Sequence, residues 1–380
     1  MAHRVLVVVG TRPEAIKMAP VLRSMRAYES DIETQLVLTG QHTTLVEEVL
    51  KAFSLTPDHD LGIMTEGQSL SDIVGRSIDG LEHVINAFSP EIVLVQGDTA
   101  SVFAASISAF LGRVKVGHVE AGLRSHNKAA PFPEEVLRRL TDVVADLHFA
   151  PTSSAVASLH LEGIQRDTIH LTGNTVVDAL LSVAALNRPI QSSELRTVIA
   201  DKDARLVLLT ARRRESFGQP LQDIFSAVRQ LVDREEDLHV IYPVHPNPNV
   251  SGPASQALSA HPRIHLVKPL SYTDLIAVLK AAALVLTDSG GIQEEAPTFG
   301  THVLVLRDVT ERPEGIEAGV AQLVGTDQAM ILDRSLAALA GSVTSKRMNP
   351  YGDGRAGERI ADIVHSELTG RPRRTEDWIS

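Results

Sequence analysis

Short apolar runs rich in β-branched residues alternate with longer, helix-like stretches along the whole chain. This alternation is typical of repeated strand–helix–strand units, and therefore of parallel sheets covered by helices. The first series of expected strands is Val5–Val9, Gln35–Leu38, Ile92–Val95, Val114–Val119, His148–Ala150 and Ile169–Leu171. The second series is Leu206–Leu209, His239–Pro243, Ile264–Leu266, Leu284–Thr287 and Val303–Leu306. The sequence therefore predicts an α/β protein with two doubly wound sheets.

A chain of 380 residues suits two domains. The polar, Pro-containing segment 187–194 separates the two series of strands, as a linker region would. Two doubly wound domains place a ligand crevice between them, and ligands of such sheets bind outside the carboxyl ends of the strands. The residues that directly follow each strand are therefore the candidates for function.

The composition excludes several classes of site and partner. The chain has no cysteine, which rules out disulfides, thiolate zinc sites and a cysteine nucleophile. With 36 Lys+Arg against 47 Asp+Glu, the net charge of −11 argues against a whole-protein grip on nucleic acid or on an anionic membrane. The apolar run at Val5–Val9 is too short for a secretion signal, and no stretch approaches the ~18 apolar residues of a membrane helix. We expect a soluble, cytoplasmic protein.

Two cations follow the first expected strand, in Gly10-Thr11-Arg12-Pro13-Glu14-Ala15-Ile16-Lys17. Thr11 can cap a helix, and Pro13 suits its first turn. Arg12 and Lys17 would flank the N-terminus of that helix, where backbone N–H groups and the helix dipole favour an anion. The alternative is a capped helix with two solvated cations.

Three carboxylates follow later strands of the first series. They are Asp98 in Gly97-Asp98-Thr99, Glu120 in the His118–Arg124 segment, and Glu134 in Pro131-Phe132-Pro133-Glu134-Glu135. Alone, Asp98 could be a helix N-cap and Glu134 a partner of a helix dipole. Glu120 would need a partner such as Arg124. Together, three converging carboxylates could raise one another's pKa values and supply an acid and a base near neutral pH.

The helix that begins at Glu134 is expected to be amphipathic. Its apolar stripe is Val136, Leu137, Leu140, Val143, Val144 and Leu147. Such a stripe is typical of a helix that packs one face against a core.

The second series of strands supplies cations. Its first strand is followed by Arg212, Arg213 and Arg214. A run of charges usually forms a solvated surface, but this run interrupts apolar structure at a strand end, which favours a binding role. His245 lies in a loop punctuated by prolines, where a purely structural role is an equal alternative. Arg312 follows the last strand of the series.

A Ser289-Gly290-Gly291 turn lies between a strand and a helix. Its small residues let the backbone approach a ligand closely, and its N–H groups can point at a phosphate. Glu295, expected on the first helical turn, could accept hydrogen bonds from ribose hydroxyls or simply compensate the helix dipole. Cations from both domains that face three carboxylates indicate a diphosphate-bearing ligand beside an acid/base centre.

These segments resemble the non-hydrolysing UDP-N-acetylglucosamine 2-epimerases nearly end to end. The matching motifs include GTRPEAIKMAP, TGQH, QGDT, VGHVEAGLRS, PFPEE, RRESFG, YPVHPNPNV, LTDSGGIQEEAP and LRDVTERPEG. The resemblance implies the GT-B architecture, two Rossmann-like domains with an interdomain cleft. Residues 1–172 would form the N-terminal domain, joined by a C-terminal helix at about 358–380, and residues 173–357 the UDP-binding domain.

The resemblance also implies a reaction, the interconversion of UDP-N-acetylglucosamine and UDP-N-acetylmannosamine. UDP leaves C1 as the C2 proton is removed, which gives a bound 2-acetamidoglucal, and UDP re-adds after C2 is protonated from the opposite face. A base and a stabilised diphosphate leaving group are both needed because the C2 proton is poorly acidic. The family implies no cofactor, no metal and a homodimer, and neither nucleic acid nor a membrane as partner.

Site roles carry over by motif. Asp98 and Glu120 would transfer the C2 proton on opposite faces with Glu134 in support, and the choice of acid and base stays open. The expected contacts of UDP are Arg12, Lys17, Arg213, His245, Leu270, Ser289, Gly290, Gly291, Glu295 and Arg312.

Two positions depart from the family pattern. Arg212 stands where the family usually has a functional histidine, and arginine is a permanent cation that cannot shuttle protons near neutral pH. Arg212 would replace the histidine if that residue offsets phosphate charge, and would slow the cycle if it transfers a proton. The alternatives are a hydrolysing 2-epimerase that releases N-acetylmannosamine and UDP, a GT-B glycosyltransferase, and a catalytically weakened UDP-sugar-binding protein. Gln41 is kept, but Thr44 and Gly67 depart from the family's activator segment, so activation by a second substrate molecule is not expected.

Overall fold

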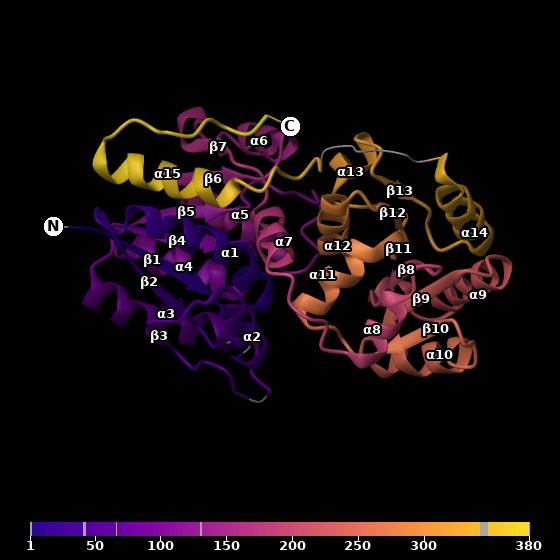
Figure 1. Ribbon diagram of the computed structural model, residues 1–380. Helices are drawn as coiled ribbons and strands as arrows, with labels where there is room; N and C mark the ends of the chain where they lie inside the picture. The colour runs from indigo at the N-terminus through magenta and orange to yellow at the C-terminus, as the bar shows by residue number, and fades with distance from the viewer. Residues whose placement is uncertain (1, 41–42, 66, 130, 343–348, 380) are drawn as a thin grey trace. The chain divides into compact units, whose positions relative to one another are not determined.

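The chain forms two compact units, one of Met1–Ala179 with Tyr351–Ser380 and one of Leu180–Pro350. The computed structural model describes residues 2–40, 43–65, 67–129, 131–342 and 349–379. Each unit holds one parallel sheet with helices against both faces (Figure 1). The expected α/β class with two doubly wound sheets is therefore confirmed.

The first unit is built on a seven-stranded sheet in the order β3-β2-β1-β4-β5-β6-β7. Its strands are β1 (His3–Val9), β2 (Ile32–Leu38), β3 (His59–Asp60), β4 (Ile92–Gln96), β5 (Lys115–Val119), β6 (Leu147–Ala150) and β7 (Ile169–Leu171). Its helices are α1 (Arg12–Met25), α2 (Thr43–Phe53), α3 (Leu70–Phe88), α4 (Ala100–Leu111), α5 (Glu134–Val144), α6 (Ser153–Leu161) and α15 (Ala356–Thr369), and α7 (Thr175–Ala185) begins in this unit and ends in the second. The strand order reverses between β1 and β4, which is the point where such sheets bind ligands.

The C-terminal helix α15 packs against α1, far away in sequence. A glycine is needed at the contact, because a Cβ on Gly357 would lie 2.8 Å from the backbone carbonyl carbon of Pro20. The Asp178 carboxylate accepts a hydrogen bond of 2.8 Å from the Gly357 N–H and so satisfies a donor at the start of α15. The last helix of the chain thereby completes the first unit.

The second unit is built on a six-stranded sheet in the order β10-β9-β8-β11-β12-β13. Its strands are β8 (Arg205–Thr210), β9 (Leu238–Pro243), β10 (Ile264–Val267), β11 (Ala282–Thr287), β12 (His302–Val305) and β13 (Ala321–Leu323). Its helices are α8 (Ser193–Ala200), α9 (Gln219–Arg234), α10 (Pro248–Leu258), α11 (Tyr272–Ala281), α12 (Gly290–Glu295), α13 (Pro313–Glu317) and α14 (Gln328–Ala337). Buried apolar side chains form one core on each face of the sheet.

Helix α5 buries its polar side more deeply than its apolar side. Its buried residues are the polar Glu135, Arg138, Thr141 and Asp142, whereas Leu140 is 42% and Val143 72% exposed. The polar side is turned inward because it meets partners near the carboxyl ends of β4 and β5. Arg138 donates to Asp98, and Asp142 contacts His118. The helix is amphipathic as expected, and Leu137 of its apolar stripe packs against a small buried cluster of Ile63, Ile73 and Ala100. Leu140 and Val143 are exposed instead, and Leu147 is the buried first residue of β6.

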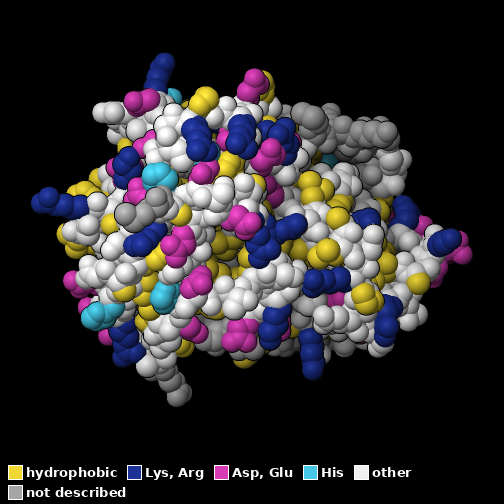
Figure 2. Space-filling view, turned by 60° about the vertical axis from the view of Figure 1, so that its left-hand side comes forward, with side chains coloured by type: hydrophobic (Ala, Val, Ile, Leu, Met, Phe, Trp, Pro, Cys, Tyr) yellow, Lys and Arg dark blue, Asp and Glu magenta, His cyan; other side chains and the backbone are white. Residues whose placement is uncertain are grey.

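The surface is mixed in charge. On the face drawn in Figure 2, acidic and basic side chains lie interspersed. In the part of the chain that the structure describes, no helix has the length and apolar character needed to cross a membrane.

Candidate active site

Asp98 and Glu120 follow the neighbouring parallel strands β4 and β5, whose last residues Gln96 and Val119 pair directly. Glu120 is 5% exposed and has a φ of 66°, the left-handed region that non-glycine residues seldom adopt. Such strain persists where the surrounding structure over-determines it, and it clusters at functional sites. The two strand ends therefore bring two carboxylates to one edge of the sheet.

The Glu120 carboxylate is held through one oxygen. Its Oε2 lies 2.7 Å from Lys17 Nζ on α1 and also accepts a hydrogen bond from the Gln96 side chain. Its Oε1 accepts no hydrogen bond from the residues that the structure describes. The open oxygen is the one that can act on a ligand.

The expected pairing of Glu120 with Arg124 is wrong. Arg124 Nη2 instead lies 2.6 Å from Asp142 Oδ2 and 2.7 Å from Glu162 Oε2. Arg124 thus contacts α5 and the residue that follows α6, whereas Glu120 contacts α1 and β4.

Asp98 is held by Arg138 of α5, whose Nη2 donates to Asp98 Oδ2. The same guanidinium reaches the Glu120 backbone carbonyl at 3.5 Å through Nη1. One arginine thus contacts the ends of both strands. Glu134 is the half-buried first residue of α5, and its carboxylate makes no hydrogen bond within the described ranges.

A further carboxylate, Glu14, joins the ends of β1 and β4. It is 2% exposed and accepts hydrogen bonds from Gly10 N at 2.6 Å, Thr11 Oγ1 at 2.8 Å and Thr99 Oγ1 at 2.9 Å. Burial raises its pKa to about 7. Thr11 occupies the N-cap position of α1, but its hydroxyl binds Glu14 instead of capping the helix, which corrects the expected capping role. The sequence analysis missed Glu14, although its place between Arg12 and Lys17 could have marked it as a candidate site residue.

In the second unit, Asp288 at the end of β11 fixes the arginine segment after β8. Its Oδ2 accepts backbone hydrogen bonds from Arg212 N at 2.6 Å and Arg213 N at 2.7 Å. Burial raises the pKa of this carboxyl. The backbone at these two positions is therefore held without their side chains. Sequence analysis missed Asp288 although it lies next to the Ser289 turn.

The arginine side chains of this segment are open. Arg212 is exposed and Arg213 half-buried, and neither guanidinium has a hydrogen bond or ion pair within the described part of the chain. Two permanent cations at a strand end are available to an anion.

The turn at Ser289-Gly290-Gly291 has the expected form. Thr287 Oγ1 accepts a hydrogen bond of 2.9 Å from Ser289 N, and α12 begins at Gly290. Arg312 passes so close that a Cβ at Gly290 would lie 3.1 Å from its Cζ, so glycine permits the approach. Arg312 Nε lies 2.9 Å from Glu294 Oε1, which fixes the guanidinium beside the turn.

Glu295 is the last residue of α12, so its expected place on the first helical turn is wrong. His245 and Leu270, both half-buried, follow β9 and β10, at the same carboxyl edge as Arg212 and Ser289. His245 Nδ1 accepts a hydrogen bond of 3.2 Å from Asn247 N, which leaves Nε2 for a ligand. Gln41 lies outside the described residues.

The fold and the strand-end chemistry define a GT-B-like protein of two Rossmann-like units. The model of the UDP-N-acetylglucosamine 2-epimerase family matches residues 25–365. A UDP-N-acetylglucosamine 2-epimerase of Bacillus subtilis is 44% identical over 364 residues, 94% of this chain and 94% of the relative. The chain belongs to the UDP-N-acetylglucosamine 2-epimerase family.

Two solved structures extend the likeness to three dimensions. The structure of a protein from Listeria monocytogenes that carries the name UDP-N-acetylglucosamine 2-epimerase has a TM-score of 0.92 and 44% identity, with 100% of both chains covered. The UDP-GlcNAc 2-epimerase of Neisseria meningitidis, solved with bound UDP-GlcNAc, has a TM-score of 0.85 and 38% identity over 95% of this chain and 99% of that one.

Proposed function

We propose that this chain interconverts UDP-N-acetylglucosamine and UDP-N-acetylmannosamine. The observation that carries the proposal is the pair of ion-paired carboxylates, Asp98 with Arg138 and Glu120 with Lys17, at adjacent strand ends in a chain of this family. The cations hold each carboxylate in place at its strand end, and a carboxylate so placed can exchange a proton with a ligand. A cytoplasmic location stays a prediction.

The proposed cycle uses the two carboxylates in turn. One takes the C2 proton while the C1–O bond breaks and its electrons leave with UDP, which gives a C1=C2 double bond. The other, which carries a proton at the start of the cycle, then donates it to C2 from the opposite face, and a UDP oxygen re-adds at C1. Because the reaction is reversible and inverts C2, Asp98 and Glu120 exchange the roles of acid and base with direction. Glu134 is the supporting carboxylate.

The leaving group needs cations. We assign UDP binding to Arg12, Lys17, Arg213, His245, Leu270, Ser289, Gly290, Gly291, Glu295 and Arg312. The N–H groups of the Ser289 turn and the guanidinium of Arg312 beside it suit a diphosphate. Stabilising the charge that develops on a leaving diphosphate is the largest contribution such a site can make. The mechanism requires no added cofactor.

The test is incubation with UDP-N-acetylglucosamine in D2O, followed by NMR of the sugar. Epimerisation gives deuterium at C2 and a nucleotide-linked manno product. Free N-acetylmannosamine plus UDP would instead identify a hydrolysing enzyme, and an unchanged but bound substrate would identify a binding protein. Either result contradicts the proposal.

Arg212 is proposed to offset phosphate charge in place of the usual histidine. Its guanidinium is exposed and its backbone is held by Asp288, so a substitution removes the charge without moving the loop. Arg212→Ala should weaken UDP binding by about 10- to 100-fold in calorimetry, the range of a hydrogen bond to a charged group. Arg196→Ala, which removes an exposed arginine of α8, is the matched control and should not change the affinity.

A faster C2 exchange in Arg212→His, with UDP affinity unchanged, would contradict this role. Such a result would show that the position transfers protons.

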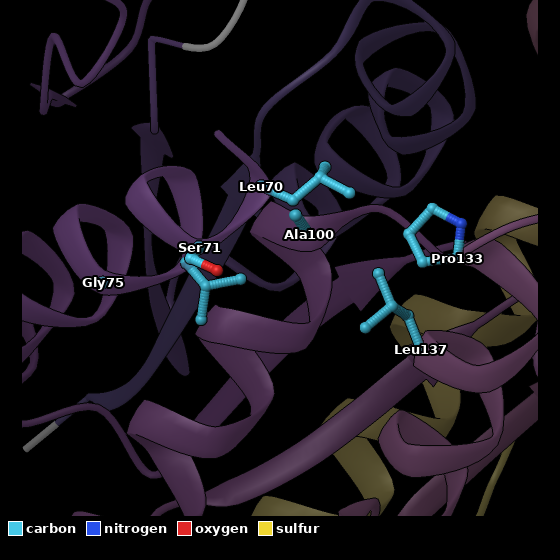
Figure 3. Close-up of a pocket in the computed structure, with 7 residues that line it drawn as sticks. Leu70, Ser71, Gly75, Ala100, Pro133 and Leu137 are labelled. Atoms are coloured by element: carbon cyan, nitrogen blue, oxygen red, sulfur yellow. The ribbon is translucent and has the colours of Figure 1, made fainter. Parts of the chain in front are cut away.

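We propose that a second copy of this chain covers the apolar side of α5. Leu140 and Val143 are exposed there, and Leu137 of the same helix lines a pocket of about 370 Å³ between α3, α4 and α5 (Figure 3). The pocket is lined by Leu70, Ser71, Val74, Gly75, Ala100, Pro133 and Leu137. An exposed apolar helix face that adjoins an apolar pocket is typical of an interface between copies.

Val143→Glu is expected to shift the chain from dimer to monomer in light scattering coupled to size exclusion. A buried carboxylate without a partner strongly opposes association. Leu161→Glu changes an equally apolar side chain of α6 that is 85% exposed, and should leave the dimer intact. A monomeric parent chain would overturn the proposed assembly.

A further inference from the structure

A fully buried histidine lies two residues before Glu120. His118 of β5 is 0% exposed, and its Nε2 lies 2.8 Å from the carbonyl oxygen of Gly97, the residue before Asp98. Its Nδ1 lies 2.6 Å from Asp142 Oδ1 on α5. One imidazole thus connects β5 with the end of β4 and with the helix that packs over both.

Both atoms that face the ring are acceptors. A carbonyl oxygen can only accept, and so can an ionised carboxylate. Burial works to raise the pKa of Asp142, but His118 and Arg124 outweigh it and lower this pKa to about 2. A neutral imidazole has one N–H and one lone pair, and would set that lone pair against an acceptor.

We propose that His118 is held as an imidazolium ion, and that it is a positioning residue that fixes the Gly97–Asp98 turn and the strand end of Glu120 relative to each other. The proposal rests on the acid/base roles proposed above. Both ring N–H groups donate, one to each acceptor.

The charges around the ring are balanced. Arg124 lies against the second oxygen of Asp142 at 2.6 Å, and Glu162 binds Arg124 at 2.7 Å. His148 on β6 faces the same helix, and burial lowers its pKa. Two cations, His118 and Arg124, therefore alternate with two anions in one chain of contacts, which is the condition under which buried charges are tolerated.

The consequence is geometric control of the reaction. Asp142 and Arg138 belong to the same helix, so His118 also sets the position of the guanidinium that binds Asp98. A shift of about 1 Å between a reacting atom and its catalytic group can cost about 100-fold in rate. Loss of the bridge should therefore lower turnover more than substrate binding.

His118→Gln is the main test, with His148→Gln as the matched control. His148 pairs directly with His118 across β5 and β6, is 2% exposed and binds the Asp142 carbonyl oxygen at 2.9 Å, but its hydrogen bonds do not reach Gly97. We expect kcat for C2 exchange to fall about 10- to 100-fold in His118→Gln with KM changed less than about threefold. Because His148→Gln loses a contact with α5 but none with Gly97, its kcat should fall by less than about threefold at a similar loss of Tm. Equal losses of kcat in both variants would overturn the positioning role.

The charge state is read separately by NMR of histidine labelled with ¹⁵N. At about pH 8, both ring nitrogens of His118 should carry protons, because each faces a hydrogen-bond acceptor. The signal is assigned by its loss in His118→Gln or, if that variant does not fold, by its shift in Asp142→Asn. A ring nitrogen without a proton would overturn the imidazolium. Because the measurement needs no substrate, a chain that keeps the doubly protonated ring but does not epimerise would refute the proposed function alone.

Discussion

Glu120→Gln is expected to slow epimerisation by about 10²- to 10⁴-fold, the range typical of a lost general acid or base. The amide cannot accept the C2 proton, and it also ends the 2.7 Å ion pair with Lys17. UDP affinity should change far less, because most of the assigned UDP contacts lie in the second unit. The measurement is the rate of deuterium incorporation at C2, with UDP affinity from calorimetry and Tm as a check on folding.

The matched control for this prediction is Glu367→Gln. Glu367 accepts from Lys115 of the same strand β5 at 2.5 Å, but it is exposed at the surface. It should leave exchange within about twofold, since surface ion pairs contribute little. Deuterium incorporation at the parent rate in Glu120→Gln would remove Glu120 from the proton-transfer step.

Gly122→Ala is expected to destabilise the first unit by about 2–5 kcal/mol. Gly122 has a φ of 85°, and a Cβ there would lie 2.9 Å from the Ala155 carbonyl carbon and 2.9 Å from Leu159 Cγ. The left-handed conformation costs about 1–2 kcal/mol and the steric overlap about 1–3 kcal/mol more. Exchange at C2 should fall too, because the overlap displaces the turn that begins at Glu120. The measurement is urea unfolding beside C2 exchange.

Gly163→Ala separates the cost of the left-handed backbone from the cost of the steric overlap. Gly163 has the same φ of 85°, but nothing lies within 4 Å of a Cβ at that position. It should lose only the conformational part, about 1–2 kcal/mol, with exchange retained. Equal losses of stability in both variants would show that the overlap at Gly122 is relieved by small movements of α6.

The sequence predicts the strands of this fold well because each buried parallel strand is a short, continuous run of apolar, β-branched residues. All eleven expected strands are present, with ends shifted by a few residues. Two strands of the described residues were missed, β3 with two residues and β13 with three, while β7, also three residues long, was predicted from its apolar run. The residues after each strand were also predictable, because parallel strands bring their carboxyl ends to one edge.

The partners of these residues were not predictable, since partners are chosen by the fold and not by the neighbouring sequence. Lys17 and Glu120 are 103 residues apart, and Arg138 reaches Asp98 across 40. Glu14 and Asp288 accept hydrogen bonds from backbone N–H or hydroxyl groups. Such donors carry no charge, so a pattern of charged residues does not reveal these contacts.

Helix α5 shows a second limit of sequence patterns. The periodicity of its apolar residues correctly gives an amphipathic helix, but periodicity does not state which side is inside. Here the charged side is inside because Arg138 and Asp142 find partners at the strand ends. A helix that serves an active site can thus reverse the usual arrangement of apolar core and polar surface.

The two backbone bonds from residues 212 and 213 to Asp288 have an evolutionary consequence. Since the main chain there is secured by a neighbouring strand end, natural variation can exchange one side chain for another without loss of local architecture. A side chain at position 212 can therefore change in length and charge while its backbone keeps the hydrogen bond to Asp288. A library of substitutions at this one position would therefore compare chemical groups on a constant scaffold, which is the condition under which a new substrate preference can be selected.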